Sequence, residues 1–541
     1  NLDDLKELEP IDKADLPSEM QESNLPEQSK YRAIEVESDD DMLKIAQSLS
    51  PDQMIPFMKI IDYCFKQSIA GSSAMASDPP RLIAHGGGGT GKTFMINATS
   101  KWAEKILRKP GDCPLKPKVL LLAPTGMAAC LIGGTTLQTG LGLKFGTKYL
   151  PLQDAKREEY RVLFEDLQLI IIDEFSMVGA DALYDIHRRL CEIFVTEDLF
   201  GGCAVLMVGD LLQLPPVKAR PIFTRPMYHK NVSLWSSDQN LWSSFESVTL
   251  TTNFRHGISE WTNCLNRLRL GELTENDRAL LEERRLSKHL DLDQRNACHV
   301  YYSNEEVDDY NMEALESVEG DIVKLEADIV VPKGYRPYIT PHGTIDDTQF
   351  RKILELKIGV RVMLTFNVQI SDSLINGALG TVIGFVHGSK GNIIAVIVTF
   401  DDPTVGNLQR ARYKEVCKGF EEQNGCPIFR SSLKTQGRSN NSISSHGASV
   451  KITQFPLRLS FSSTGHKLQG TTIKSNLVAH GYNKTVPKCL YYVMLSRCTS
   501  IDNIYLDDNF DLDKIQCSSK ALKEVERLDS KSLTKDIEKE A

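Results

Sequence analysis

Short runs of consecutive apolar residues alternate with longer amphipathic stretches over the first half of the chain. Runs of four or five apolar residues predict strands that are buried on both faces of a sheet, and they comprise residues 119–123, 169–172 and 204–208. Residues 82–83 predict another short strand, and residues 94–107 follow it with a helical pattern, as residues 51–70 do before it. Because strands that alternate with helices build parallel sheets, we expect an α/β domain over residues 49–247.

The second half of the chain carries shorter and more varied patterns. Residues 261–288 are charged and predict helices, whereas residues 299–302 predict a strand. Short apolar runs separated by turn signals predict a small β-barrel within residues 357–455. Two further apolar runs predict strands at residues 457–461 and 490–495. The second half therefore predicts another α/β domain, which the barrel interrupts.

Charge is distributed unevenly along a chain whose overall composition is ordinary for a globular protein. Residues 1–50 carry 14 acidic and 5 basic side chains, whereas the rest of the chain carries 58 of each. The acidic head at residues 1–48 is rich in Ser, Pro and Glu and poor in aromatic residues, which predicts a disordered tail or linker. The neutral remainder is compatible with a basic groove.

The cysteines and the apolar runs narrow the class of protein. The twelve cysteines are scattered without a C-x-x-C pair, which argues against a zinc ribbon or a disulfide framework and favours a reducing, intracellular compartment. No apolar run approaches the roughly 20 residues that cross a bilayer, so we expect no membrane insertion. The first residue is Asn rather than Met, so we expect a processed product or a piece of a longer polypeptide.

A basic segment and a charged tail lie outside the regular patterns. Residues 403–451 hold eight basic and three acidic side chains, and the polar stretch at 436–449 predicts a mobile loop. Such a loop fits either a solvated surface insertion or a contact with phosphates. The expected organisation is a head at 1–48, a first α/β domain at 49–247, a second one at 248–356 and 456–510, the barrel insertion at 357–455 and a helical tail at 511–541.

One glycine-rich loop carries a specific chemical signal. Residues 86–93, GGGGTGKT, match the phosphate-binding pattern G-x-x-x-x-G-K-[ST] at every fixed position. The glycines let backbone N–H groups surround phosphates, the Lys92 ammonium adds a positive charge, and the Thr93 hydroxyl can bind Mg²⁺. A flexible linker is the alternative, which the flanking strand and helix patterns disfavour. The predicted nucleotide-binding residues are Gly87, Gly88, Gly89, Thr90, Gly91, Lys92 and Thr93.

Two later strands end in polar residues that would complete such a site. Asp173 and Glu174 directly follow the strand at 169–172. Asp173 would hold Mg²⁺, and Glu174 would orient or deprotonate the water that attacks the terminal phosphate. The strand at 204–208 leads into a turn that places the Gln213 amide near the same sheet edge. Taken alone, an Asp-Glu pair is common on protein surfaces, and capping of a proline-rich turn explains Gln213 equally well.

The order of these motifs resembles that of a known helicase family. The phosphate loop, residues 123–129 (APTGMAA), 173–177 (DEFSM) and 209–217 (GDLLQLPPV) follow one another as in superfamily one, class B DNA helicases of the PIF type (petite integration frequency). Residues 250–255 and 492–497 resemble that family's fourth and sixth motifs. Within the family, the chain is most similar to the helicase portion of Helitron rolling-circle transposons.

The resemblance covers about residues 49–506 and implies a particular fold and site. The implied fold has two RecA-like parallel-sheet domains with an SH3-like β-barrel inserted in the second. Arg255 and Arg497 would act as arginine fingers on the phosphates of ATP, with a surface salt bridge as the alternative for each. The further ATP-site positions that the resemblance implies are Gln53 for adenine, and Gln469 and Gly470 for coupling ATP state to the grip on DNA.

The resemblance also implies a path for single-stranded DNA across both domains. The residues that it places on DNA are Thr125, Gly126, Gln138, Thr139, His466 and Lys467, which suit contacts to phosphates without sequence readout. Relatives usually have His where Gln138 stands, an aliphatic residue at Gly465 and a small polar residue at Leu468. The detailed DNA contacts therefore depart from the family pattern.

An amphipathic segment lies between the second and third motifs, where relatives carry a signature segment. Its apolar positions have the spacing of a buried helical face, and they are Leu183, Ile186, Leu190 and Ile193. Core packing explains these positions. The polar residues on the same segment, His187, Arg188 and Arg189, are candidates for the DNA side.

These observations predict an ATP-dependent DNA helicase that uses ATP and Mg²⁺ and binds single-stranded DNA and forks. The resemblance alone implies that it moves 5′ to 3′. Roles in repair, recombination or transposition, an upstream nuclease domain, and a nuclear or mitochondrial location are further implications. An ATP-switched DNA-binding module without processive unwinding is the alternative, although Glu174 and both arginines exceed what a switch requires. The DEFS sequence disfavours an RNA helicase of the same superfamily.

Overall fold

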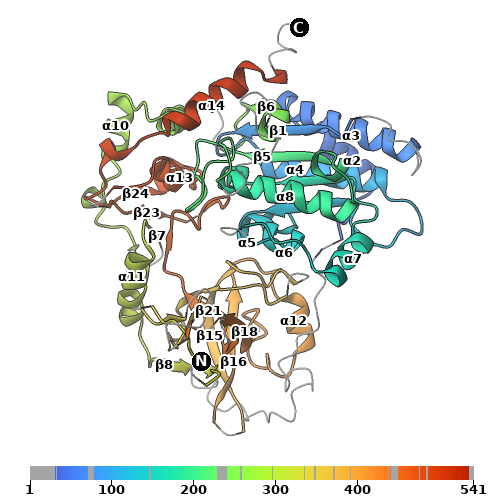
Figure 1. Cartoon of the computed structure of the whole chain (residues 1–541). Coiled ribbons are helices and arrows are strands. Elements are labelled where there is room, and N and C mark those ends of the chain that lie inside the picture. Colours follow the sequence, from blue (N-terminus) through green and yellow to red (C-terminus); the bar gives the residue numbers. More distant parts are fainter. Residues whose placement is uncertain are drawn as a thin grey trace. The chain divides into compact units, whose positions relative to one another are not determined.

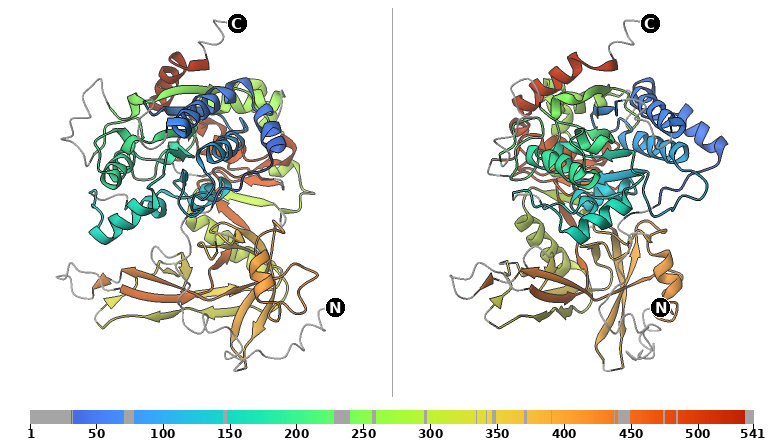
Figure 2. Two further views of the ribbon diagram at one scale, coloured as in Figure 1. Left: turned by 90° about the vertical axis from the view of Figure 1, so that its right-hand side faces the viewer. Right: turned by 45° about the vertical axis from the view of Figure 1, so that its right-hand side comes forward.

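The structure is a computed structural model of the 541-residue chain, and it divides into two units (Figure 1, Figure 2). The described residues are 31, 33–70, 78–144, 148–227, 240–255, 259–294, 297–333, 335–340, 342–345, 349–369, 372–389, 391–436, 438–439, 449–473, 475–482 and 485–534. Those within 29–292 and 465–541 form one unit, which we call the parallel-sheet unit. Those within 293–464 form the other, which we call the β-rich unit.

A six-stranded parallel sheet forms the centre of the parallel-sheet unit, with the strand order β3-β2-β4-β5-β1-β6. Its strands are β1 (Arg81–Gly86), β2 (Val119–Ala123), β3 (Thr135–Thr136), β4 (Leu169–Ile172), β5 (Ala204–Gly209) and β6 (Glu246–Leu250). The carboxyl ends of parallel strands meet at one sheet edge. The strand order therefore brings together the residues that follow β4, β5 and β1.

Helices cover both faces of this sheet (Figure 1). On one face, α3 (Pro51–Ala70) and α4 (Lys92–Leu107) bury side chains such as Ile60 and Met95. On the other face, α8 (Ala180–Phe194) and α14 (Ser519–Ser530) bury side chains such as Ile186 and Leu528. Successive residues of β4 point alternately into these two cores. Burial on both faces explains the continuous apolar runs and confirms the strands and helices that they predicted.

The remaining regular elements of this unit include one correction. They are α2 (Asp39–Gln47), α5 (Gly126–Leu131), α6 (Leu137–Leu141), α7 (Asp154–Leu163), α9 (Glu260–Leu270), α10 (Glu275–Glu282), α13 (Leu490–Leu495), β23 (Leu477–Ala479) and β24 (Ile504–Leu506). The strand predicted at residues 490–495 is wrong, because these residues form α13. All six are buried, so the helix is apolar on every side. A short run without periodicity does not separate a buried helix from a buried strand.

An antiparallel sheet of order β17-β16-β15-β14-β21 forms the main core of the β-rich unit. Its strands are β14 (Arg361–Leu364), β15 (Leu379–His387), β16 (Ile393–Phe400), β17 (Cys426–Phe429) and β21 (Leu457–Leu459). On β16, Val396 and Val398 face one core and Ala395 and Ile397 face another. The described pairing leaves β17 and β21 as edges. Short antiparallel strands are thus confirmed, and closure into a barrel stays a prediction.

Smaller sheets and two helices complete the β-rich unit. Their bounds are β7 (Cys298–Tyr301), α11 (Asn304–Ser317), β8 (Val323–Glu326), β9 (Asp328–Val330), β10 (Tyr335–Arg336), β11 (Thr344–Ile345), β12 (Phe350–Arg351), β13 (Ile353–Leu356), α12 (Asn407–Arg412), β18 (Ser431–Gln436), β19 (Arg438–Ser439), β20 (Ser449–Gln454) and β22 (Ser462–Thr464). The domain expected at 248–356 and 456–510 has strands in both units, so the compact units do not follow the expected boundaries. Those boundaries stay a prediction.

Much of the expected basic loop at 403–451 is regular structure. It contains α12, β17 and β18, and Tyr413, Val416 and Phe420 are buried against β16. These few apolar side chains set the local fold, although basic residues dominate the composition. Of the polar stretch at 436–449, residues 437 and 440–448 lie outside the described residues.

The end of the acidic head is also ordered, which corrects the expectation of a disordered segment up to residue 48. Residues 1–30 and 32 lie outside the described residues, but α2 begins after an N-cap at Ser38. Met42 of α2 is buried, and its carbonyl oxygen accepts a hydrogen bond from Trp102 Nε1 at 3.0 Å. Within the part of the chain that the structure describes, every helix is too short or too polar to span a bilayer.

Candidate active site

The glycine-rich loop at residues 86–93 joins the end of β1 to the first turn of α4. Gly89 and Gly91 have φ angles of +89° and +70°, in the left-handed region that glycine tolerates best. A Cβ atom at Gly89 would lie 2.7 Å from Asn253 Oδ1, so the close approach also requires glycine. The loop is therefore a tight turn at a helix N-terminus, the arrangement that binds phosphate groups.

The ammonium group of Lys92 lies inside this loop. Its Nζ donates hydrogen bonds to the carbonyl oxygens of Gly86 at 2.9 Å and Gly87 at 2.8 Å. Burial lowers the pKa of Lys92, while the nearby carboxylates oppose this shift. The Thr90 hydroxyl closes the loop by donating to the Gly87 carbonyl oxygen at 3.0 Å.

Two distant segments bind the loop from outside. The Phe254 N–H donates to the Gly89 carbonyl oxygen at 2.8 Å, and Asn253 Nδ2 donates to the Gly88 carbonyl oxygen at 3.0 Å. The Gly88 N–H donates to the Tyr492 hydroxyl of α13 at 2.9 Å. Sequence reasoning assigned no role to Tyr492, although it begins the motif at residues 492–497.

Asp173 and Glu174 follow β4 directly and are 5% and 4% exposed. The Glu174 N–H donates to Asp173 Oδ1 at 2.8 Å. Glu174 has a φ angle of +50°, a conformation that costs energy in any residue other than glycine and recurs at functional sites. Burial and the neighbouring Glu174 carboxylate raise the pKa of Asp173 to about 7. Both carboxylates thus lie where the sequence placed them.

Gln469 contacts the Glu174 carboxylate, and Gly470 follows it in a left-handed conformation close to that carboxylate. Gln469 is 3% exposed, and its Nε2 donates to Glu174 Oε2 at 3.0 Å and to the Ser176 hydroxyl at 3.3 Å. A Cβ atom at Gly470, whose φ angle is +83°, would lie 3.3 Å from Glu174 Oε1. Gln469 therefore contacts the predicted catalytic carboxylate directly, and Gly470 lies next to it.

A buried ion pair that the sequence did not reveal closes the end of β5. Asp210 is fully buried, and its carboxylate accepts hydrogen bonds from Arg269 Nη2 at 2.6 Å and Nε at 3.0 Å. Burial alone would raise the pKa of Asp210, but the Arg269 guanidinium holds it below its usual value. The Gln213 Nε2 lies 3.4 Å from Asp210 Oδ2, and Gln213 Oε1 is buried and accepts no hydrogen bond from any described residue.

Arg255 lies beside Gly89 of the glycine-rich loop, and Arg497 lies near Arg255 and the Glu174 carboxylate. Arg255 Nη1 donates to the Ser496 carbonyl oxygen at 2.9 Å, and burial together with the nearby Arg497 lowers the pKa of Arg255 to about 10. Arg497 is 2% exposed and donates from Nε to the Val493 carbonyl oxygen at 2.8 Å. Among the described residues neither guanidinium forms an ion pair, so the surface salt bridge considered for each is not found.

Gln53 lies in the first turn of α3 and also contacts the loop. Its Nε2 donates to the carbonyl oxygens of Thr90 at 2.9 Å and Gly91 at 3.3 Å, and its Oε1 accepts from the Ser50 N–H at 3.1 Å. Both ends of the amide are therefore engaged with the backbone. Recognition of adenine by Gln53 stays a prediction.

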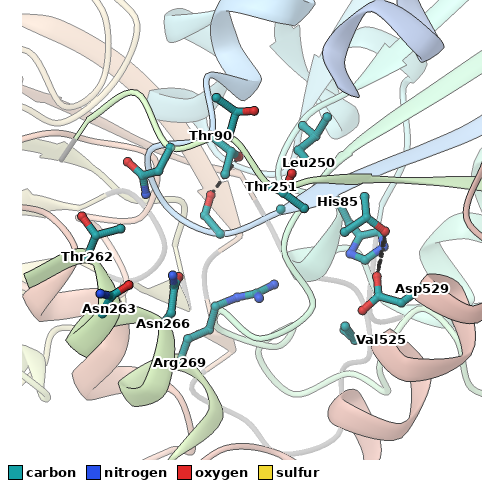
Figure 3. Close-up of a pocket in the computed structure, with 15 residues that line it drawn as sticks. His85, Thr90, Leu250, Thr251, Thr262, Asn263, Asn266, Arg269, Val525 and Asp529 are labelled. Carbon is teal, nitrogen blue, oxygen red and sulfur yellow. Dashed lines mark hydrogen bonds and ion pairs between the residues drawn. The ribbon is translucent and has the colours of Figure 1, made fainter. Parts of the chain in front are cut away.

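A pocket of about 540 Å³ adjoins the loop, and its lining includes Gly86, Gly87 and Thr90. Figure 3 shows Asn263, Asn266 and Arg269 on α9 on one side of it, with Thr90 and Thr251 opposite. At its other end, His85 Nε2 lies 3.3 Å from Asp529 Oδ1. Hydroxyl, amide and charged side chains thus line a cavity of the size that accepts small ligands.

The predicted DNA contacts lie on separate elements of the parallel-sheet unit. Thr125 caps α5 by accepting the Ala128 N–H at 3.2 Å, and Gly126 is the first residue of that helix. Gln138 and Thr139 are exposed on α6. His466 and Lys467 are half-buried, and burial lowers the pKa of His466. Their roles on DNA stay predictions.

Two of the polar residues on α8 are structural, which corrects their candidacy for DNA contact. His187 is 5% exposed, and its Nδ1 accepts the Phe200 N–H at 3.1 Å. Arg189 is 2% exposed and pairs with Glu192 at 2.6 Å. Only Arg188 of the three is exposed, with its guanidinium 4.2 Å from the centre of the Tyr149 ring. Their polar character alone did not show which of them the helix packing would bury.

The donor set fits a magnesium ion that is shared with a nucleotide. Among the described residues, no group of three or more His, Cys, Asp or Glu side chains converges as a dedicated metal site would. Phosphate loops hold Mg²⁺ with one hydroxyl and one carboxylate, while phosphate oxygens and waters supply the rest. Thr93, in the first turn of α4, and Asp173, after β4, provide these two oxygen donors at the same sheet edge.

Comparison with known proteins identifies one helicase family that the chain resembles. Residues 64–279 match the family described as PIF1-like helicase, and residues 348–385 match the 2B domain of the DNA helicase Pif1. Over these two segments, the chain is similar to the PIF1-like helicase family. The predicted family is thereby confirmed, and the resemblance to Helitron transposons stays a prediction.

Curated PIF1-like relatives are similar over most of this chain. The ATP-dependent DNA helicase PIF1 of Emericella nidulans is 27% identical over 453 residues, which cover 77% of this chain and 56% of that protein. The ATP-dependent DNA helicase RRM3 of Saccharomyces cerevisiae is 26% identical over 495 residues, covering 82% and 65%. The chain thus spans between about half and two thirds of the length of these relatives.

Solved structures of Pif1 helicases share the fold. Pif1 from Bacteroides, in complex with ADP-AlF3 and single-stranded DNA, is 25% identical with a TM-score of 0.60, covering 87% of this chain and 96% of that one. Pif1 from Candida albicans is 24% identical with a TM-score of 0.64, covering 89% and 99%. These likenesses confirm the α/β fold with a RecA-like parallel sheet for this PIF1-like chain.

Proposed function

We propose that this PIF1-like chain is an ATP-dependent DNA helicase that translocates on single-stranded DNA. One observation carries the proposal: the phosphate loop, the Asp173–Glu174 pair and both arginines converge on one site, and Gln469 is hydrogen-bonded to Glu174. A loop that only bound nucleotide would not need a buried carboxylate next to the metal position. The arrangement therefore favours hydrolysis over an ATP-switched binding module.

Each site residue has a separate role in the proposed hydrolysis of ATP. The N–H groups of the loop and the Lys92 ammonium bind the phosphates of ATP, and Glu174 orients the attacking water and accepts its proton. Arg255 and Arg497 stabilise the negative charge that develops on the transferred phosphoryl group. Thr93 and Asp173 would hold Mg²⁺, which supplies positive charge between the phosphates.

Hydrolysis is coupled to DNA through the segment that carries Lys467 and Gln469. These residues are two positions apart, so a DNA phosphate on Lys467 and the Glu174 carboxylate on Gln469 act on the same short segment. A shift of the segment on binding DNA changes the position of Gln469 against Glu174. Single-stranded DNA would therefore stimulate ATP hydrolysis by shifting a population of conformations.

Comparisons support the substrates of this proposal. The relatives are named ATP-dependent DNA helicases, and solved Pif1 structures contain ADP-AlF3 with single-stranded DNA or concern unwinding at forked DNA. We extend ATP, single-stranded DNA and forks to this chain on that basis. Movement from 5′ to 3′, two RecA-like domains with an inserted barrel, and a place in repair, recombination or rolling-circle transposition within the nucleus or mitochondrion belong to the same proposal.

The first test is ATP turnover with and without single-stranded DNA. We expect Lys92→Ala to abolish hydrolysis with an unchanged circular dichroism spectrum, and Glu174→Gln to bind ATP and DNA tightly without turnover. Lys66→Ala is the matched control, because Lys66 is an exposed α3 residue that pairs with Asp62 at 2.6 Å. Normal turnover in either site variant would refute the site.

A second test addresses the substrate and the direction of movement. Strand displacement is measured on duplexes with a 5′ or a 3′ overhang, and stimulation of ATP hydrolysis by DNA is compared with that by RNA. We expect unwinding from the 5′ overhang and stronger stimulation by DNA. Unwinding from the 3′ overhang alone would overturn the class B assignment, and DNA-stimulated turnover without any unwinding would favour the switched module.

A further inference from the structure

The carboxylate of Asp52 joins the first turn of α3 to the segment that follows β6. Asp52 is 5% exposed, and its Oδ2 accepts the backbone N–H groups of Thr251 at 2.6 Å and Thr252 at 3.1 Å. Its Oδ1 accepts the Gln53 N–H at 3.0 Å and the Ser50 hydroxyl. One buried carboxylate therefore holds two consecutive amides of a distant segment.

That segment leads from Asp52 directly to Arg255. Beyond Thr252, it binds the phosphate loop through Asn253 and Phe254. The Arg255 N–H then donates to Asn253 Oδ1 at 3.0 Å, and the Arg255 guanidinium donates to the Ser496 carbonyl oxygen. The position of the guanidinium thus depends on a short chain whose start is fixed by Asp52.

The same helical turn holds the phosphate loop itself. Gln53, the neighbour of Asp52, donates to the carbonyl oxygens of Thr90 and Gly91. The first turn of α3 consequently contacts both the phosphate loop and the arginine-bearing segment, one through each residue. A turn that is hydrogen-bonded to both the phosphate loop and the arginine-bearing segment fixes the distance between these two segments.

We propose that Asp52 is a positioning residue that holds residues 251–255 so that Arg255 meets the phosphates of ATP. The inference rests on the proposed function, since it gives Asp52 a role in positioning Arg255 for ATP hydrolysis. The hydrogen bonds that Asp52 forms with described residues reach Ser50, Gln53 and the segment but not the phosphate loop, so Asp52 acts through the segment. Small displacements of a catalytic group lower rates steeply, so the contact affects the chemical step more than binding.

A purely structural role for Asp52 is the competing explanation. A carboxylate in the first turn of a helix stabilises that helix, since it lies near the positive end of the helix dipole. Loss of this effect would lower the stability of α3 without a specific effect on Arg255. The two explanations therefore predict different kinetics, amide exchange and coupling to Arg255.

The experiment compares steady-state ATP hydrolysis by the full chain and its Asp52 variants with single-stranded DNA present. We expect Asp52→Ala to lower kcat between about tenfold and about 100-fold while KM for ATP changes less than about twofold. Asp52→Asn should lower kcat less, because its side-chain carbonyl oxygen can still accept hydrogen bonds from the backbone N–H groups of the segment. Asp62→Asn is the control, since Asp62 is an exposed carboxylate of the same helix that contacts Lys66.

The decisive comparison is the double variant with Arg255→Ala. If Asp52 acts through Arg255, then Asp52→Ala combined with Arg255→Ala hydrolyses ATP no more slowly than Arg255→Ala alone. If the two substitutions lower kcat independently, so that their reductions multiply in the double variant, the inference is wrong. It is also wrong if Asp52→Ala keeps the wild-type kcat while Arg255→Ala is slow. Either result leaves the proposed function standing. Absence of ATP turnover in the wild-type chain would instead overturn the proposed function, and the inference with it.

Amide hydrogen exchange gives a readout that does not depend on activity. We expect peptides covering residues 249–255 to exchange faster in Asp52→Ala than in the wild type and in Asp62→Asn. Faster exchange confined to α3, with residues 249–255 unchanged, would show that Asp52 only caps the helix and would overturn the inference. The same measurement applies if Asp52→Ala is less stable, because exchange is compared between segments of one protein.

Discussion

Several charged side chains of the site are buried, and some of them are held by a partner from a distant part of the chain. The Asp210–Arg269 pair is the clearest case, because Asp210 follows β5 and Arg269 lies on α9, and the carboxylate is fully buried. A buried charge that loses its partner keeps its cost of desolvation, whereas an exposed pair loses little. The pair therefore ties α9 to the sheet edge.

This argument predicts the effect of removing Arg269. We expect Arg269→Ala to lower the free energy of unfolding by about 3–5 kcal/mol, measured by urea unfolding with tryptophan fluorescence. The double variant Asp210→Asn with Arg269→Leu should lose less, because no buried charge remains. Arg278→Ala is the control, since its pair with Asp513 is exposed and is worth about 1 kcal/mol or less. If Arg269→Ala and Arg278→Ala lower the free energy of unfolding equally, the prediction is wrong.

At this scale, the sequence identified residues whose type and spacing match motifs that bind phosphates. Lys92, Asp173, Glu174, Arg255 and Arg497, singled out by these motifs and by the family resemblance, lie near one another in the structure, and their roles on phosphates stay predictions. Asp52, Arg269 and Tyr492 were missed as site residues. Their role is to hold other protein groups, and such contacts depend on which elements the fold brings together rather than on a local motif.

Elements were predictable where periodicity and length left one interpretation. The runs at β2, β4 and β5 are too short for helices and lie between helical patterns, so they were identified correctly. The run at α13 is also short and mainly apolar but is a helix, and all six of its residues are buried. The segment at 403–451 shows the opposite failure, in that a few buried aromatic and aliphatic residues order a chain that is basic on average.

The buried face of α8 predicts a dependence of stability on pH. Burial, with a smaller effect of Arg188, lowers the pKa of His187 to about 4 from its ordinary 6.5. Between these two values the unfolded chain binds a proton at His187 that the folded chain does not, so the contribution of His187 to stability is greatest above pH 6.5 and falls as the pH falls towards 4. Between pH 7 and pH 5, His187 should lower the free energy of unfolding by about 2 kcal/mol.

Replacing His187 tests this dependence. We expect the unfolding free energy of His187→Gln to fall less than that of the wild type between pH 7 and pH 5, by about 2 kcal/mol. Urea unfolding at each pH measures it. His289→Gln serves as the control, because His289 is less buried and contacts the Glu283 carbonyl oxygen at the surface. If wild type and His187→Gln respond identically to pH, the burial of His187 has no such consequence.

At the scale of the whole molecule, the proposed ATP site lies within one unit. The loop, both carboxylates, Gln469 and both arginines belong to the parallel-sheet unit, although they come from opposite ends of the chain. The β-rich unit has separate hydrophobic cores, such as that around Val396 and Leu364. The sequence predicted the site but not this division, because the chain leaves the unit after residue 292 and returns at 465 without a distinctive linker.

Nucleotide should therefore stabilise one unit selectively. Three of the chain's four tryptophans, Trp102, Trp242 and Trp261, fall within the parallel-sheet unit, so their fluorescence reports its unfolding, and the fourth, Trp235, lies outside the described residues. A ligand at 100 times its Kd adds about 2.7 kcal/mol to the stability of the structure that binds it. ADP with Mg²⁺ at that concentration should raise the temperature of the fluorescence transition and leave a second calorimetric transition, that of the β-rich unit, unchanged.

The Lys92→Ala variant separates this effect from general stabilisation by salt or ligand. Without the Lys92 ammonium, the phosphates lose a main contact, so the fluorescence transition should no longer move at the same nucleotide concentration. A single calorimetric transition that shifts as a whole would mean that the two units unfold as one. In that case nucleotide binding would stabilise both cores together, and the energetic separation that their distinct cores imply would be absent.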